Sequence, residues 1–212
     1  MYRMGWKQPF KLMWETTDGV RFLVGAPRFM IDIQLTSDDL EFCKKHADLM
    51  CKGFFTYSFK NDQVQSNDVY LIGKIGELAC KKFLEGLDKV KILHEPFRDS
   101  YAKYNKNDDF IIEKDGVKTQ IEVRTKQRSV APKGNYECCT DCIKPDMLYL
   151  FVSYNKNNNI ATLLGTADWE VFSTSAWETK KGSENNNFVH KVTEFNVFIK
   201  DLDLIERFSK VV

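Results

Sequence analysis

Two extended segments, 110–113 and 119–125, flank an Asp115-Gly116 pair, and this arrangement constrains the fold more than any other feature of the chain. An Asp-Gly pair between alternating apolar residues is a strong signal for a tight hairpin, because both turn residues must adopt positive φ angles. A further extended segment, 90–94, precedes the hairpin. The sequence therefore predicts a run of neighbouring strands.

A helix and a second pair of strands surround this run. Apolar residues recur at the helical period over 69–86, and strands are expected at 147–154 and 160–164 across an Asn-rich turn. The stretch 128–144 contains Pro and Gly and is expected to be a loop. A helix followed by strands predicts an α/β fold with a mixed central β-sheet flanked by helices, not a doubly wound parallel sheet.

The first third of the chain is expected to add a β-α module. Short strands precede a helix predicted over 38–52, for which Thr36 or Ser37 is a suitable N-cap. We therefore predict an N-terminal β-α extension over 1–68, packed on a core over 69–212.

Composition limits the classes of protein that need to be considered. The 212 residues are 43% hydrophobic and 29% charged, as is usual for a globular protein, and the net charge is +1. No apolar run approaches the length that spans a bilayer, so no membrane partner is expected. The six cysteines are unevenly spaced, which suits reduced thiols better than a framework of disulfide bonds. These features predict a cytoplasmic protein.

The residues that carry chemistry lie on the hairpin. Alternation along a strand sends Glu122, Arg124 and Lys126 to one face and the apolar neighbours to the other. The tight turn folds the preceding strand back, so that Asp109 at its start can lie near Glu122. Two carboxylates from neighbouring strands can share a hard divalent cation.

This pattern resembles the PD-(D/E)xK nuclease superfamily, the fold of many restriction enzymes and of archaeal Holliday-junction resolvases. Asp109 matches the acidic residue that starts one strand, and Glu122-Val123-Arg124 matches the acidic-x-Lys triplet on the next, with Arg in place of Lys. Glu77, within Gly-Glu-Leu-Ala, matches a helical glutamate of many members. The resemblance covers about 70–208 and implies a restriction-endonuclease-like core.

The resemblance also implies a function. It predicts a Mg²⁺-dependent endonuclease that hydrolyses phosphodiester bonds in DNA, with Mn²⁺ able to substitute, by in-line attack of water that leaves 5′-phosphates. Asp109, Glu122 and Glu77 would be the metal ligands and Arg124 would stabilise charge, with Lys126 as a second candidate for that role. Lys126 and Arg128 would contact DNA. A homodimer and the choice between DNA and RNA stay open.

Each assignment has an alternative. Asp109 also suits a turn, Glu122 a solvent-facing strand position and Glu77 a plain surface acid, and the basic residues near the triplet suit a solvated face. The Arg at position 124 also fits a catalytically inactive DNA-binding module on the same fold.

Three cysteines form a separate motif. Cys138, Cys139 and Cys142 give Cys-Cys-x-x-Cys, which is compatible with zinc or an iron–sulfur cluster and with a cysteine-metal interaction protein. A complete site needs a fourth ligand, for which Cys80 and Asp141 are candidates. Free thiols are the default expectation.

Overall fold

A computed structural model describes residues 16–17, 20–22, 30–55, 67–97, 109–134, 136–141, 143–185, 188–189, 193–203 and 205. The helices in these ranges are α1 (Ser37–Phe55), α2 (Asn67–Glu85), α3 (Trp169–Ser175) and the 3-10 turn η1 (Ile199–Asp201). The largest sheet contains β1 (Thr16–Thr17), β2 (Val20–Phe22), β3 (Ile31–Gln34), β4 (Lys91–His94), β5 (Phe110–Lys114), β6 (Val117–Gln127), β8 (Met147–Asn155) and β9 (Ile160–Ala167). Two small sheets contain β7 (Glu137–Thr140), β10 (Trp177–Thr179) and β13 (Glu194–Phe198), and β11 (Glu184–Asn185) and β12 (Phe188–Val189).

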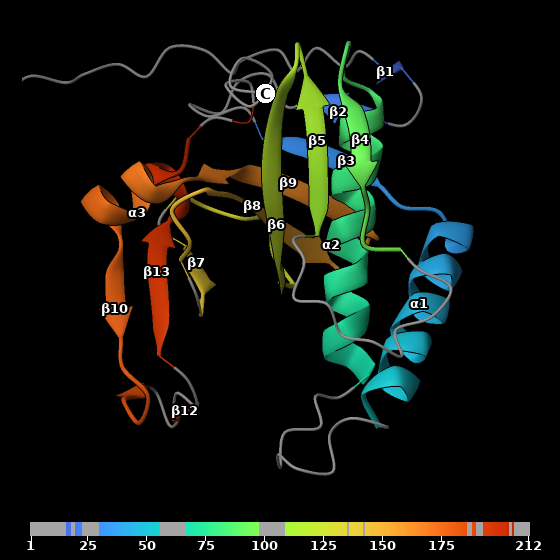
Figure 1. Ribbon diagram of the computed structural model, residues 1–212. Helices are drawn as coiled ribbons and strands as arrows, with labels where there is room; N and C mark the ends of the chain where they lie inside the picture. The colour runs from blue at the N-terminus through green and yellow to red at the C-terminus, as the bar shows by residue number, and fades with distance from the viewer. Residues whose placement is uncertain are drawn as a thin grey trace, which may run out of the picture.

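The large sheet is mixed, as predicted, and the protein is an α/β protein (Figure 1). Its strand order is β1-β2-β3-β9-β8-β6-β5-β4. The described neighbours are antiparallel except β6 and β8, which are parallel and pair from Gln120↔Met147 to Gln127↔Tyr154. The N-terminal strands extend this sheet through the β3–β9 pairing. None of the helices in the described ranges is long and apolar enough to cross a bilayer.

The β5–β6 hairpin forms at the predicted turn. Asp115 and Gly116 have φ angles of 50° and 83°, which a tight two-residue turn requires and which glycine adopts without strain. The pairing Phe110↔Ile121 continues to Lys114↔Val117. The turn therefore determines the register that brings the start of β5 level with the middle of β6.

The first long helix begins at the predicted cap. Thr36 Oγ1 accepts a hydrogen bond from Asp39 N at 3.2 Å, and Asp39 Oδ2 accepts one from Thr36 N at 2.8 Å. This reciprocal pair satisfies two backbone donors that the first turn of a helix leaves without partners. Lys82 on α2 donates to the same Asp39 carboxylate at 2.7 Å, which ties α2 to α1.

Two hydrophobic cores lie on opposite faces of the large sheet. The first is formed by α1, α2 and one face of the strands, including Ile121 and Val123 of β6. The second lies between the sheet, α3 and the strands β7 and β13. Because β8 contributes Leu150 to the first core and Phe151 to the second, it is buried on both faces, and the sheet separates α2 from β7.

The expectation that 128–144 is a loop was wrong in part. Residues Glu137–Thr140 form β7, which pairs antiparallel with β13 from Glu137↔Phe198 to Thr140↔Phe195. A strand of four residues carries too little periodicity to be detected beside Pro132 and Gly134, and its partner lies far away in the sequence.

One glycine decides how closely α2 approaches β6. A Cβ atom on Gly76 would lie 1.7 Å from Thr125 Oγ1, whereas a Cβ on Gly73 in the same helix would meet no atom within 4 Å. We expect Gly76→Ala to lower the free energy of unfolding by about 1–3 kcal/mol through overpacking. Gly73→Ala, the matched control, should raise it by about 0.5–1 kcal/mol, because alanine loses less backbone entropy in a helix. Urea denaturation of both variants measures this difference, and equal shifts would contradict the close contact.

Candidate active site

Asp109 lies where β5 begins, and its carboxylate bonds to the neighbouring strand. The pairing with β6 starts at Phe110↔Ile121, so the Val123 amide, two residues further along β6, has no β5 residue opposite it. Asp109 Oδ2 accepts the hydrogen bond from Val123 N at 2.8 Å. A backbone donor inside the sheet needs such an acceptor, and this bond holds the carboxylate against the centre of the triplet.

Glu77 and Lys74 approach the same place from α2. Glu77 is 8% exposed and Lys74 is 2% exposed, and Lys74 Nζ lies 2.5 Å from Glu77 Oε2. The alternative of a surface acid at Glu77 was therefore wrong. A buried carboxylate is costly unless it is paired, so the Lys74 ammonium stabilises the ionised form of Glu77.

Charged groups from both α2 and β6 influence the pKa of Asp109. The pKa of Asp109 is raised from its usual 3.8 to about 7, mainly by desolvation and further by repulsion from Glu77. The hydrogen bond from Val123 and the charges of Lys74 and Arg124 act in the opposite direction. Asp109 thus interacts with Glu77 and Lys74 from α2 and with Arg124 from β6.

Glu122 and Arg124 lie on the face of β6 that points away from α2. Their neighbours Ile121 and Val123 are buried against α2, so alternation turns the triplet side chains toward β7. Arg124 Nη2 lies 3.2 Å from Glu122 Oε1 and donates to Asp141 Oδ1 at 2.9 Å. Its buried Nε has no hydrogen-bond partner among the described residues.

The two other predicted basic residues continue along this strand. Lys126 is exposed at the end of β6. Arg128 Nη2 donates to the backbone oxygen of Glu137 at 2.8 Å, and its guanidinium lies 5.8 Å from the centre of the Tyr136 ring. Lys126 is therefore available to an external partner, whereas Arg128 is engaged by the segment that leads into β7.

The predicted site residues form two groups that meet at Asp109. One group contains Glu77 with Lys74, and the other contains Glu122 with Arg124 and Asp141. Sequence reasoning missed Lys74 and the pairing of Asp141 with Arg124. The Lys-x-x-Glu spacing was a usable signal for Lys74, because residues three apart share one side of a helix.

The three cysteines of the motif do not share one environment. Cys138 is buried in the second core, whereas Cys139 is half-buried on the other side of β7, and Cys142 lies outside the described residues. Cys80 belongs to the first core, across the sheet, so it is not positioned to be a fourth ligand. Burial raises the pKa of the Cys80 thiol well above its usual range, and the charges of Asp109 and Glu77 add to the effect.

This separation leads to a prediction about bound metal. Metal analysis of purified protein should find substoichiometric zinc and iron, because adjacent residues of a strand point to opposite faces and do not chelate one ion together. The purified protein should also be colourless. A stoichiometric metal that is lost in a Cys139→Ser, Cys142→Ser double variant would contradict the free-thiol expectation.

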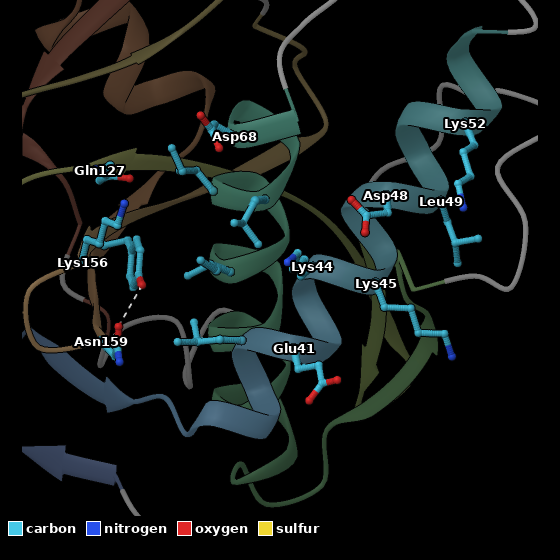
Figure 2. A pocket seen from close by; sticks show the side chains of 15 residues that line it. Glu41, Lys44, Lys45, Asp48, Leu49, Lys52, Asp68, Gln127, Lys156 and Asn159 are labelled. Atoms are coloured by element: carbon cyan, nitrogen blue, oxygen red, sulfur yellow. Dashed lines mark hydrogen bonds between the residues drawn. The ribbon is translucent and has the colours of Figure 1, made fainter.

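Among the residues that the structure describes, hollows adjoin the sheet beside β4 to β6 and beside α1 and α2. One, of about 590 Å³, is lined by residues of β4 to β6 that include Lys118 and Gln120, on the same face as Glu122, and by the acidic Asp146 just before β8. The other, of about 1100 Å³, lies between α1, α2 and the β8–β9 turn (Figure 2). In that view Lys44 points from α1 toward α2, whereas Lys45 points away. Acidic and basic residues line the larger hollow in similar numbers, so its charge selects no class of ligand.

No protein-family model, curated protein or solved structure matches this chain. Within the described ranges, no group of three or more His, Cys, Asp or Glu side chains is arranged to hold a metal ion. The site therefore rests on the geometry of Glu77, Asp109 and the triplet alone.

Proposed function

We propose that this protein is a divalent-metal-dependent nuclease that hydrolyses phosphodiester bonds in DNA on a restriction-endonuclease-like core. The observation that carries the proposal is the position of Asp109. Its carboxylate bonds to the backbone of the triplet strand and lies near the buried Glu77 of α2. Carboxyl groups with strongly shifted pKa values gather at functional sites.

The order of elements supports the choice of fold. Along the chain, α2 is followed by β4, β5 and β6, which pair antiparallel in that order. The later strand β8 then pairs parallel with β6. An acidic residue at the start of β5 and an acidic-x-basic triplet in β6 occupy the positions that the resemblance to PD-(D/E)xK nucleases assigns to them. The segment between β6 and β8, where that family has a helix, contains β7 instead.

The residues present fit Mg²⁺ by the chemistry of their donors. Glu77 and Asp109 offer hard carboxylate oxygens, and Mg²⁺ is usually bound by one or two carboxylates together with water and substrate phosphate. Repulsion between these two groups is a cost that a bound cation would relieve. When bound, the ion would supply an activated water and would stabilise charge on the phosphate.

The side chains of the protein have separate tasks in this proposal. Glu77 and Asp109 would hold the ion, and the Val123 amide keeps the Asp109 carboxylate in place. Glu122 points to the opposite face of β6 from α2, so its task is to orient Arg124 through their ion pair and not to share the ion with Glu77. Arg124 always carries a positive charge, so it contributes by attraction to phosphate oxygens and not as a base.

Exposed groups on the same side of the strands suit a DNA backbone. Lys118 and Gln120 line the hollow of about 590 Å³, and Lys126 is exposed at the other end of β6. Such residues contact phosphates and sugars without reading the bases. Glu122 and Arg124 lie between Lys118 and Lys126 along β6.

The pairing of Arg124 with Asp141 favours one second candidate. Two carboxylates beside the Arg124 guanidinium offset its positive charge and weaken its attraction to a phosphate. Such an arrangement is expected of a DNA-binding module that has lost catalysis. The Asp141 side chain is 56% exposed, however, and an exposed ion pair contributes only about 0–1 kcal/mol. A phosphate can therefore displace it at small cost, and we prefer the enzyme.

Incubation of the protein with supercoiled plasmid and with linear DNA tests the proposal directly. We expect cleavage with Mg²⁺ or Mn²⁺ and none with EDTA, because the ion activates the attacking water. Glu122→Ala should also lose cleavage and still bind DNA, since Lys118 and Lys126 are unchanged. Cutting that persists in EDTA, or at an unchanged rate in the folded Glu122→Ala variant, would rule out this site.

A further inference from the structure

Lys74 is a buried ammonium group inside the candidate site. Its Nζ lies 2.5 Å from Glu77 Oε2 and donates to the backbone oxygen of Pro96 at 3.3 Å. The Phe97 ring lies over it, with 5.4 Å between Nζ and the ring centre. These contacts hold the ammonium on the inner side of α2, away from water.

The positive charge acts on more than its direct partner. Lys74 lowers the pKa of Asp109, which Glu77 and desolvation raise. The Lys74 ammonium thus pairs with Glu77 and also attracts the Asp109 carboxylate, which comes from a different element. Moving an ammonium out of water costs several kcal/mol, so an apolar side chain would hold α2 against the sheet at lower cost if packing were the only role of this residue.

We propose that Lys74 is the internal counter-cation of the Glu77–Asp109 pair and competes with the divalent ion for these carboxylates. This inference rests on the proposed function and concerns how strongly the same site binds the divalent ion. Lys74 is a positioning residue, because it contacts Glu77 and not the substrate. It keeps the two carboxylates together when no metal is present, and it lowers the affinity for metal that the pair would otherwise have.

Removing this charge should have two opposite effects. The metal-free fold should become less stable, because two buried carboxylates lose the cation between them. Affinity for a divalent cation should rise, because the ion no longer competes with an ammonium for the same oxygens. A lysine with a purely structural role would produce the first effect without the second.

The test is the binding of Mg²⁺ and Mn²⁺ to DNA-free full-length protein, followed by calorimetry. We expect Lys74→Gln, which keeps an amide donor for Glu77, to bind either ion about tenfold more tightly than wild type. The rise in melting temperature on addition of Mg²⁺ should be larger in Lys74→Gln and in Lys74→Met than in wild type, and this measurement also serves a variant of low stability. Lys82→Gln is the matched control, because it breaks another α2 ion pair, to Asp39, and should leave metal affinity unchanged.

The outcomes separate this inference from the proposed function. If wild type binds metal through Asp109 and the Lys74 variants bind with equal or lower affinity, the counter-cation role is overturned and the nuclease proposal stands. If neither wild type nor the Lys74 variants bind a divalent ion, the counter-cation role is overturned, and plasmid cleavage decides the nuclease proposal separately. Tighter binding in Lys74→Gln, absent in Lys82→Gln and lost when Asp109→Asn is added, is the result that supports the inference.

Discussion

Asp109→Asn is expected to lower DNA cleavage by about a thousandfold or more and, in the same protein, to increase the stability of the metal-free fold above neutral pH. The loss of activity follows from removing a charged ligand at the centre of the site. The gain in stability follows because asparagine keeps an oxygen that accepts the Val123 hydrogen bond but carries no buried charge. A residue kept only for folding would not show these opposite changes.

The pH dependence of stability provides an independent check. The folded pKa of Asp109, about 7, is raised above its usual value of 3.8. Between these values the unfolded chain has lost the proton while the folded protein retains it, so the unfolded state binds fewer protons and stability falls as pH rises. Above about pH 7 the cost is fully present, and below about pH 4 it is absent. Asp109→Asn removes this contribution, on the order of a few kcal/mol.

Chemical denaturation at pH 5 and pH 8 without metal, combined with plasmid cleavage, measures both effects. Asp168→Asn is the matched control, because Asp168 Oδ1 also accepts a backbone hydrogen bond, from Val171 N at 3.0 Å, at the start of α3. Asparagine caps a helix as well as aspartate does, so neither readout should change. Near-normal cleavage by Asp109→Asn would remove Asp109 from the site.

Arg124→Ala should lower cleavage by about a hundredfold or more, whereas Arg124→Lys should keep measurable activity. The guanidinium can act only as a fixed positive group, and deleting one charge-stabilising donor has an effect of this size. Lysine keeps the charge but not the planar group that contacts both Glu122 and Asp141. We therefore expect a smaller loss for the lysine variant.

Asp141 and Lys126 help to interpret that experiment. Asp141→Asn should leave cleavage unchanged or raise it, because it frees Arg124 from a partner on the exposed side. If the flexible stem of Lys126 brings its ammonium to the phosphate, Lys126→Ala will be more damaging than Arg124→Ala. Should wild type, Arg124→Lys and Lys126→Ala all bind DNA and all fail to cut with any metal, the inactive binding module becomes the better interpretation.

Local signals in the sequence determined the elements that carry the site. The Asp115-Gly116 turn has a single favourable geometry, so the β5–β6 pairing and the position of Asp109 beside the triplet strand follow from a few neighbouring residues. The apolar period predicted α2, and alternation predicted that Ile121 and Val123 would be buried. These features depend on contacts between residues close in the sequence.

Only the tertiary structure decided which charges meet. The side of α2 that packs on β6 determines that Lys74 is buried with Glu77, and the pairing of β7 with β13 brings Asp141 to Arg124. The Lys-x-x-Glu spacing indicates the Lys74–Glu77 pair but not its burial, because such pairs are usually exposed. The Asp141–Arg124 contact has no local signal, because a four-residue strand needs a distant partner to form. The sequence alone thus predicted the strands and the helix that carry the candidate residues, whereas packing of α2 and β7 on opposite faces of the sheet set the partners of those residues.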